Sequence, residues 1–195
     1  MTGSLVAAQI LDAVERAGLL LVHDAALPCV TEVVTGGPVA GSWWSHPLAN
    51  AIYNALGELE DDVATVRLLR AKQTLVARRL WPAVAAVGAA REPWQLRRLP
   101  AAAAGLLAEV DATDAYVVPA ADRSAADALE RRLLVTSMQV HTPSGHHVKA
   151  YRSWQRWAAD RTVAAAGDVV AARHALEQAA RSTSTDVGRL VPWPV

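Results

Sequence analysis

The chain has 195 residues and a formal net charge of zero at pH 7, with 52% hydrophobic and 19% charged residues. This composition excludes a disordered chain, and the length suits one domain or two small ones. No run approaches the about 18 apolar residues of a membrane span, and a single cysteine, Cys29, excludes an internal disulfide and a cysteine-based zinc cluster.

The first predicted element is an amphipathic helix from Ser4 to about Ala17. Ser4 belongs to the residue types that cap helix N-termini, and Gly18 is a typical stop signal. Asp12 and Glu15 interrupt the apolar run, and no basic leader precedes it, which indicates a helix rather than a signal peptide. We therefore expect a cytoplasmic, reduced protein.

A second helix is predicted over residues 47–60. The apolar run at 19–22 either extends the first helix or begins a new element, and residues 24–45, rich in Pro, Gly and Thr, indicate an irregular crossing. Pro47 suits the first turn of a helix and Ser45 is a fitting N-cap. Helical spacing of apolar residues then continues up to the acidic end of this segment.

A β-hairpin is predicted to follow, because two β-type runs flank the sequence RAKQ. Pairing Leu68 with Leu75, and Val66 with Ala77, makes one apolar face. The same register places polar and basic residues on the other face and at the tip: Thr65, Arg67, Arg70, Lys72 and Arg78. The order helix, helix and hairpin is typical of a winged-helix domain, in which a helix or the hairpin contacts DNA. Helix 47–60 has no Lys or Arg, so any such contact is expected from the hairpin.

The charges are unevenly distributed along the chain. Residues 1–62 hold one basic and eight acidic side chains, whereas residues 63–98 hold eight basic side chains and one acidic. Such a basic segment is typical of nucleic-acid or anion binding. The alternative is internal pairing with the acidic segment, above all with the carboxylates of residues 58–62.

The second half of the chain repeats the plan of helix, hairpin and helix. Four residues recur at an offset of 73, among them Trp81 and Trp154, which supports two similar units. The segment 96–105 is the expected joint, and the division is predicted at residues 1–98 and 99–195. A last helix is expected from about residue 168 to 181, followed by a tail that packs back through Trp193. The predicted fold is therefore α+β and mostly helical, with two winged-helix-like units packed together.

The second hairpin concentrates polar residues around the sequence HTPSGHH. Pairing Val140 with Val148 creates an apolar face. The same register sets two pairs on the other face: His141 with His147, and Gln139 with Lys149. Facing imidazoles bind metals or exchange protons near neutral pH, but the hairpin has no carboxylate as a further ligand, and histidines exposed at a turn also explain the cluster. No metal is predicted. Nucleophile elbows and phosphate-binding glycine loops are absent from the sequence, and no cofactor is expected.

The sequence GSWWSHP places two tryptophans just before the second helix. If this segment is extended, its successive side chains point to opposite sides. One of Trp43 and Trp44 is then predicted to pack inward near Trp81. The other is predicted to line a surface cleft between His46 and the Arg78–Arg79 end of the hairpin, as an exposed platform for stacking.

These motifs together resemble a widespread bacterial family described as related to the AlkZ class of winged-helix DNA glycosylases. The resemblance covers roughly residues 25–160, from GSWWSHP through VATVRLL and RRLWP to LERRLLV and QVHTPSGHHVK. It implies tandem winged helices and a role in DNA repair. The AlkZ class uses a Gln-x-Gln or Gln-x-Asp pair on a strand, and the nearest match here is Gln139-Val140-His141, which departs from the pattern at its last position.

The sequence therefore predicts a winged-helix-type protein that binds DNA or a nucleotide-like ligand. Two alternatives stay open: a small glycosylase-like hydrolase that uses Gln139 and His141, or a protein-interaction module. The residues predicted to bind the ligand are Trp43, Trp44, His46, Arg67, Arg70, Lys72, Arg78, Arg79, His147 and Lys149.

Overall fold

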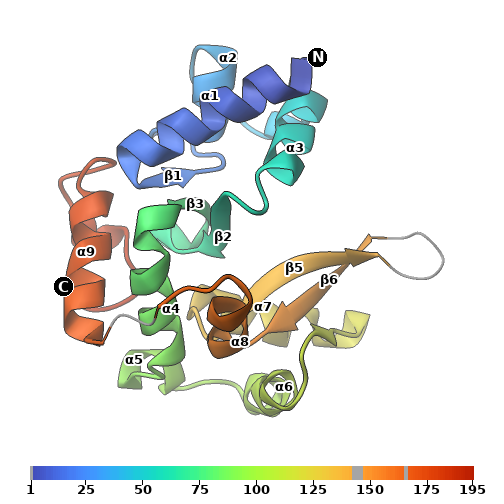
Figure 1. Ribbon diagram of the computed structural model, residues 1–195, viewed down its shortest axis with the longest axis vertical. Coiled ribbons are helices and arrows are strands. Elements are labelled where there is room, and N and C mark those ends of the chain that lie inside the picture. The colour runs from blue at the N-terminus through green and yellow to red at the C-terminus, as the bar shows by residue number, and fades with distance from the viewer. Residues whose placement is uncertain (1, 142–146, 165–166) are drawn as a thin grey trace. The chain divides into compact units, whose positions relative to one another are not determined.

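The structure of the protein is a computed structural model that describes residues 2–141, 147–164 and 167–195 (Figure 1). The fold is α+β, as predicted, with about 53% of the residues in helices and two small three-stranded antiparallel sheets. Among the residues described, none of the helices is both long enough and apolar enough for a bilayer crossing.

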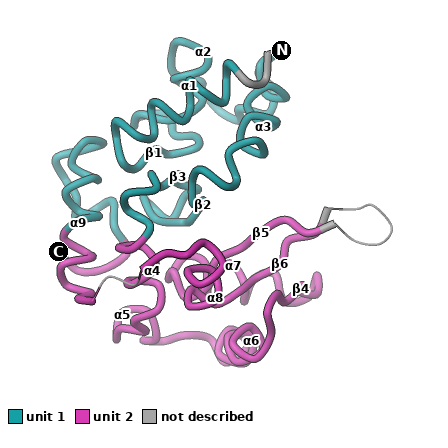
Figure 2. The backbone as a smooth tube through the Cα atoms, in the orientation of Figure 1, with its two compact units in different colours: residues 1–81, 175–191, 195 teal, residues 82–174, 192–194 magenta. Residues whose placement is uncertain are grey.

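The chain divides into two compact units (Figure 2). Unit 1 comprises residues 1–81, 175–191 and 195, and unit 2 comprises residues 82–174 and 192–194. The sequence places the division at residue 98. In the structure the joint predicted at 96–105 lies within unit 2, and the end of the chain returns to unit 1.

Unit 1 combines helices with one sheet. Its elements in chain order are α1 (Thr2–Ala17), β1 (Leu19–Leu21), α2 (Val30–Thr35), a 3-10 turn (Trp43–Ser45), α3 (Ala49–Glu58), β2 (Val63–Arg67) and β3 (Gln73–Ala77). Strand β3 lies between β1 and β2 and is antiparallel to both. Apolar residues from α1, α3 and the sheet, such as Ile10, Ile52 and Leu75, form one buried core.

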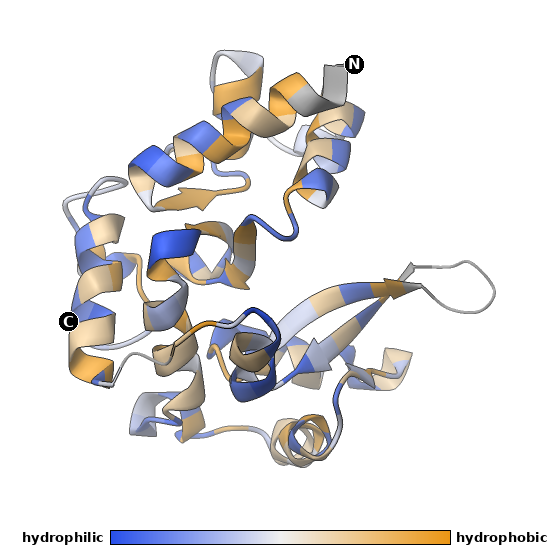
Figure 3. Ribbon diagram, viewed as in Figure 1, coloured by the Kyte–Doolittle hydropathy of each residue, from blue (hydrophilic) through white to orange (hydrophobic). Residues whose placement is uncertain are grey.

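Helix α1 alternates between apolar and polar residues along its length (Figure 3). It ends where predicted, because Gly18 adopts a φ of 82° and its N–H donates to the carbonyl of Val14 at 2.7 Å. A Cβ at Gly18 would lie 2.9 Å from Nη2 of Arg79. The helix begins at Thr2, so Ser4 lies inside it and the prediction that Ser4 caps it is wrong.

The start of α3 also differs from the prediction. The helix begins at Ala49 with Leu48 at its N-cap position, rather than at Pro47 with Ser45 as the cap. The Ser45 hydroxyl donates to the carbonyl of Ser42 at 2.8 Å. This bond belongs to the 3-10 turn, and that turn occupies the residues that would otherwise open the helix.

The register of the first hairpin is three residues away from the predicted one. Strand β2 pairs Thr65 with Leu75, and Val66 with Thr74. The connection between the strands, residues 68–72, is longer than expected. Arg70 and Ala71 in it have φ values of 53° and 55°. The N–H of Leu69 donates to Oγ1 of Thr74 at 3.0 Å. Leu68 and Leu75 are nevertheless fully buried, as predicted.

Unit 2 contains the second sheet. Its elements are α4 (Trp81–Ala89, whose first residue belongs to unit 1), α5 (Pro93–Leu96), α6 (Ala101–Ala112), β4 (Tyr116–Val117), α7 (Arg123–Arg131), β5 (Thr136–His141), β6 (His147–Arg152) and α8 (Trp154–Asp160). Strand β6 is central in this sheet. The predicted register of the second hairpin is confirmed in the pairs Gln139–Lys149, Val140–Val148 and His141–His147. The turn between them lies outside the described residues.

The final segment of the chain contributes to both units. Helix α9 (Val169–Ala180) lies close to the predicted range of 168–181, and its second half belongs to unit 1. Trp193 is buried, as the predicted return of the tail requires, and its ring lies 5.7 Å from that of Trp94 in unit 2.

The two units repeat one order of elements. From α1 in unit 1 and from α6 in unit 2, the order is helix, strand, one or two short helical segments, helix and hairpin, and the first strand pairs with the last. A helix then begins at a buried tryptophan in each case, at Trp81 and at Trp154. The indole N–H of Trp81 donates to Val76 at 3.1 Å and that of Trp154 donates to Leu133 at 2.7 Å, both to carbonyls. The correspondence at an offset of 73 therefore extends from sequence to structure.

Candidate functional site

The basic tip of the first hairpin is bound by a buried carboxylate. Oδ2 of Asp24 lies 2.8 Å from Nζ of Lys72 and 3.4 Å from Nη1 of Arg70. The Asp24 side chain is only 2% exposed, and its other oxygen accepts the N–H groups of Ala26 and Leu27. A phosphate that bound Lys72 or Arg70 would have to replace Asp24 as their partner. Asp24 would then be left as a buried charge without its cations, which is energetically costly.

The same contacts determine the acidity of Asp24. Burial raises its pKa, but the hydrogen bonds from Lys72 and from the N–H of Ala26, together with the charges of Lys72 and Arg70, lower the pKa below its ordinary value of 3.8. Asp24 is therefore ionised and binds both cations at neutral pH.

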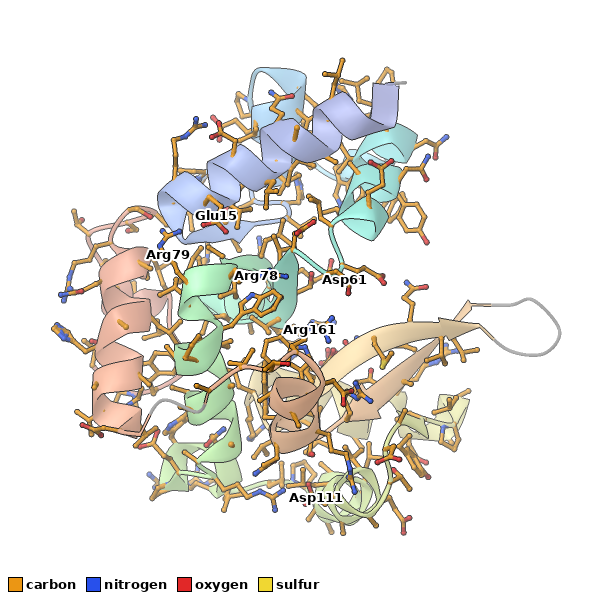
Figure 4. The ribbon with its side chains drawn as sticks, viewed as in Figure 1. Glu15, Asp61, Arg78, Arg79, Asp111 and Arg161 are labelled. Carbon is orange, nitrogen blue, oxygen red and sulfur yellow. The ribbon has the colours of Figure 1, made fainter. Side chains whose placement is uncertain are left out.

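The other cations of the first hairpin also have partners in unit 1 (Figure 4). Arg79 forms an ion pair with Glu15 at 3.1 Å and also donates to the Glu15 carbonyl. Arg78 donates to the carbonyl of Asp61 at 2.8 Å, and its guanidinium carbon lies 4.9 Å from the centre of the Trp81 ring. Arg67 is half-buried in β2 opposite Gln73. Internal pairing of the basic segment is thus observed, and Asp24 and Glu15 are among its acidic partners.

The two tryptophans of GSWWSHP do not diverge as an extended segment would require. They lie in a 3-10 turn, and their rings stack with centres 4.2 Å apart and planes at 24°. Trp43 is half-buried against the core of unit 1, whereas Trp44 is 58% exposed. Arg78 and Arg79, which the sequence places with His46 around a predicted cleft, have the partners described above.

Trp44 extends its contacts to α3 instead. Its ring lies 5.7 Å from that of Tyr53, which is 47% exposed, and Leu48, at the N-cap position of α3, is 38% exposed. We call these residues, Trp43, Trp44, Leu48 and Tyr53, the aromatic surface. His46 is half-buried, and its Nδ1 accepts the N–H of Leu48 at 3.1 Å, so its role at this place is to hold the turn.

The second hairpin carries a polar cluster on one of its faces. Gln139 and Lys149 are exposed and lie opposite each other. Nζ of Lys149 lies 2.6 Å from Oε1 of Glu130, a nearly buried carboxylate of α7 that also accepts the Ser137 hydroxyl at 2.9 Å. These bonds attach α7 to the hairpin. The backbones of His141 and His147 pair at the end of the strands, and their side chains lie outside the described part of the structure.

The hairpin of unit 2 extends past its third strand. Strand β4 pairs only with Ala150 and Tyr151 of β6, so the part around Gln139 and Lys149 is a two-stranded ribbon (Figure 2). Helix α7 exposes Arg123 and Arg131 on one stripe, and Arg131 forms an ion pair with Asp127 at 2.6 Å. We call the set Arg123, Arg131, Gln139 and Lys149 the α7–ribbon face.

The charge of the folded units reverses the pattern seen along the sequence. Unit 1, with the basic hairpin, has eight basic and ten acidic side chains, and unit 2 has eleven basic and nine acidic. The basic segment 63–98 is split between the units, and its first part is paired with acidic residues of unit 1. The candidate anion-binding surface therefore shifts from the first hairpin to unit 2.

Within the described part of the chain, no three His, Cys, Asp or Glu side chains converge as a metal site requires. A cavity of about 380 Å³ in unit 2 is lined by Arg91, Asp111, Ser153, Gln155 and Arg156, and so by none of the predicted site residues.

Three residues that organise these surfaces escaped the sequence analysis. Asp24 and Glu130 are buried acids that bind hairpin cations, and no local pattern identifies their partners, which are up to 48 residues away. Tyr53 had a signal that could have been used, since it lies on the side of α3 opposite the apolar stripe of Ile52 and Leu59.

We compared the chain with protein-family models, with curated proteins and with solved structures, and no match was found in any of the three.

Proposed function

We propose that this protein is a nucleic-acid-binding protein of the winged-helix type and that its contact surface is the α7–ribbon face of unit 2. The observation that carries the proposal is the ribbon that extends past β4 and presents Gln139 and Lys149, exposed, next to a helix with Arg123 and Arg131. A helix and an adjacent hairpin are the two parts that winged-helix domains bring to DNA.

The repeated order of elements supports the winged-helix assignment. In both units the first strand completes a three-stranded sheet with the hairpin, and the helix before the hairpin, α3 or α7, has an exposed side. The resemblance of the sequence to the AlkZ-related family implies the same architecture. Unit 2 has the better chemistry for DNA, because α3 has no Lys or Arg and α7 has both Arg123 and Arg131.

The residue types of the α7–ribbon face suit both parts of a nucleic acid. Guanidinium groups donate to phosphate oxygens, and a Gln amide donates to and accepts from a base edge. Glu130 is nearly buried and neutralises much of the Lys149 charge, whereas the Arg131–Asp127 pair is exposed to solvent and therefore weak, so Arg123 and Arg131 supply most of the phosphate contacts. Two phosphate contacts correspond to a salt slope of about −2 and to weak binding, with a dissociation constant on the order of 10⁻⁴ M.

The test is fluorescence anisotropy with a labelled duplex and a labelled single strand of the same sequence, each at two salt concentrations. Arg131→Ala is expected to weaken binding several-fold and to reduce the salt slope by about 1. Arg16→Ala is its matched control, since Arg16 is also exposed on a helix and also paired with an aspartate four residues away, but in unit 1.

Gln139→Ala tests the base-edge contact separately, because it changes no charge. It is expected to reduce the preference among sequences and to leave the salt slope unchanged. Equal effects of Arg131→Ala and Arg16→Ala, or no binding by the wild type, would refute the proposal. Release of base from alkylated DNA by the wild type, lost in Gln139→Ala, would instead identify the hydrolase.

A further inference from the structure

Strand β5 of unit 2 has an outer edge without the usual protection of an edge strand. β5 is the last strand of its sheet, and its pairing with β6 runs without interruption from Thr136 to His141 (Figure 1). Its sequence, TSMQVH, contains no Lys, Arg, Asp, Glu or Pro. Proteins protect exposed edges with charged residues, proline, a bulge or a very short strand, because unpaired backbone groups are a template for another chain. β5 has none of these devices.

The other edge strands of the two sheets differ from β5. β1 and β4 have only three and two residues, and all of β1 is buried. β2 ends with the charged Arg67. In β5, by contrast, Met138 is 38% exposed, Gln139 is exposed and Val140 is half-buried. Among the residues described, no backbone group of β5 is hydrogen-bonded to the backbone outside β6. Thr136 is buried, so the accessible part of the edge begins after it.

We propose that the β5 edge pairs antiparallel with β5 of a second copy of this chain and joins two sheets of unit 2 across a two-fold axis. The register that leaves the buried first residue of β5 outside the contact is centred on Gln139. It makes three kinds of pair: Gln139 with Gln139, Met138 with Val140, and Ser137 with His141. Apolar residues thus lie opposite apolar ones and polar residues opposite polar ones, as in stable sheets.

The chemistry of the edge selects this occupant. A ladder of alternating N–H and C=O groups is matched by another extended backbone and not by a nucleic acid or a lipid surface. β5 is complementary to itself in the register above, and without Lys, Arg, Asp or Glu it sets no like charges opposite each other. A contact in which the same strand serves both copies closes a symmetric dimer, and methionine is enriched in such interfaces.

The dimer also joins the two α7–ribbon faces, a consequence that rests on the proposed function. Opposite residues of an antiparallel pair lie on the same face of a sheet. Helix α7 is bonded through Glu130 to Ser137 and Lys149, whose side chains share a face with Gln139. Both copies therefore present this face on the same side, with the two Gln139 residues in the middle. Two linked contact surfaces bind a nucleic acid more tightly than one.

Sedimentation equilibrium of the full chain without nucleic acid measures the change from one chain to two as the concentration rises. Met138→Lys is expected to raise the dissociation constant of the dimer at least tenfold, since a lysine opposes edge pairing and occurs twice in the dimer. Val117→Lys is the matched control. Val117 is 50% exposed on the opposite edge strand, β4, and shares a cross-strand row with Met138 through Ala150. The control should leave the dissociation constant unchanged.

Disulfide formation tests the register directly. Opposite residues of antiparallel strands have Cα atoms about 4.5–5.5 Å apart, which lies within the range of about 4.4–6.8 Å that a disulfide spans. Mild oxidation should therefore link two chains of Gln139→Cys and should not link two chains of Val117→Cys. The native Cys29 is buried, and the wild type measures its contribution.

Three results would overturn the proposal. The first is a single chain at all concentrations. The second is an equal effect of Met138→Lys and Val117→Lys, which would mean that apolar faces and not edges meet. The third is disulfide formation no faster in Gln139→Cys than in Val117→Cys, and this comparison also serves if Met138→Lys does not fold by circular dichroism. A single chain would leave the α7–ribbon proposal standing, since that proposal is tested by Arg131→Ala, and failure to bind nucleic acid would leave the dimer standing.

Discussion

Gly88 in α4 is the position at which one methyl group should have the largest effect on unit 2. A Cβ built at Gly88 would lie 2.2 Å from Nε1 of Trp154 and 2.3 Å from its Cδ1. These distances are far inside van der Waals contact. Trp154 is 1% exposed, and its indole N–H donates to the carbonyl of Leu133 at 2.7 Å, so the ring has no free direction in which to move.

The expected magnitude follows from two opposing effects. Replacement of Gly by Ala inside a helix stabilises it by about 0.5–1 kcal/mol. Overpacking of a filled core costs about 1–3 kcal/mol, and displacement of the indole adds about 1 kcal/mol or more for its lost hydrogen bond. Overpacking and the lost bond outweigh the gain in propensity, so Gly88→Ala should lower the free energy of unfolding by about 2 kcal/mol.

Urea unfolding, followed by circular dichroism, measures this difference. Gly105→Ala is the matched control, because Gly105 lies in helix α6 of the same unit and a Cβ there meets nothing within 4 Å. The control should be unchanged or slightly more stable. A Gly88→Ala protein as stable as the Gly105→Ala protein would refute the packing of α4 against Trp154.

Three further predictions concern unit 1. Leu75→Ala should cost about 2–5 kcal/mol in urea unfolding, since Leu75 is fully buried; a loss below about 1 kcal/mol would contradict the register of β3. Trp44→Ala should change the free energy of unfolding by less than about 1 kcal/mol, as substitutions at exposed positions do. Trp43→Ala should lower it by about 2–3 kcal/mol, because the Trp43 ring packs on the core. Equal losses in the two variants would argue against the exposed position of Trp44. The Asp24 carboxyl has a lowered pKa, so the stability that it contributes is present above its unfolded pKa and lost as the pH falls through its lower, folded value. Asp24→Asn should therefore lower stability at pH 7 and reduce the loss of stability as the pH falls through and below 3.8; an unchanged pH profile would mean that the ion pairs with Lys72 and Arg70 do not form.

The sequence by itself determined those elements whose signals are local. The end of α1 follows from Gly18, which adopts a left-handed conformation that other residues avoid. The register of the second hairpin follows from alternation, because only one pairing puts Val140 opposite Val148 and the polar residues on the other face. The repetition of helix and hairpin, and the exposed positions of Gln139 and Lys149, were predictable for the same reason.

Tertiary structure decided the elements that depend on distant partners. The turn of the first hairpin is attached to Asp24, 46 and 48 residues away from Arg70 and Lys72, and this attachment changes both its register and its electrostatic role. The strands β1 and β4 are too short to show a pattern and exist because β3 and β6 offer an edge for pairing. The two tryptophans follow the same rule, since local preference favours an extended segment, whereas packing of Trp43 on the core and of Trp44 on its ring favours the turn. Alternation and capping act between neighbours, but a buried carboxylate or a stacked ring is stabilised only by the groups that the fold brings to it.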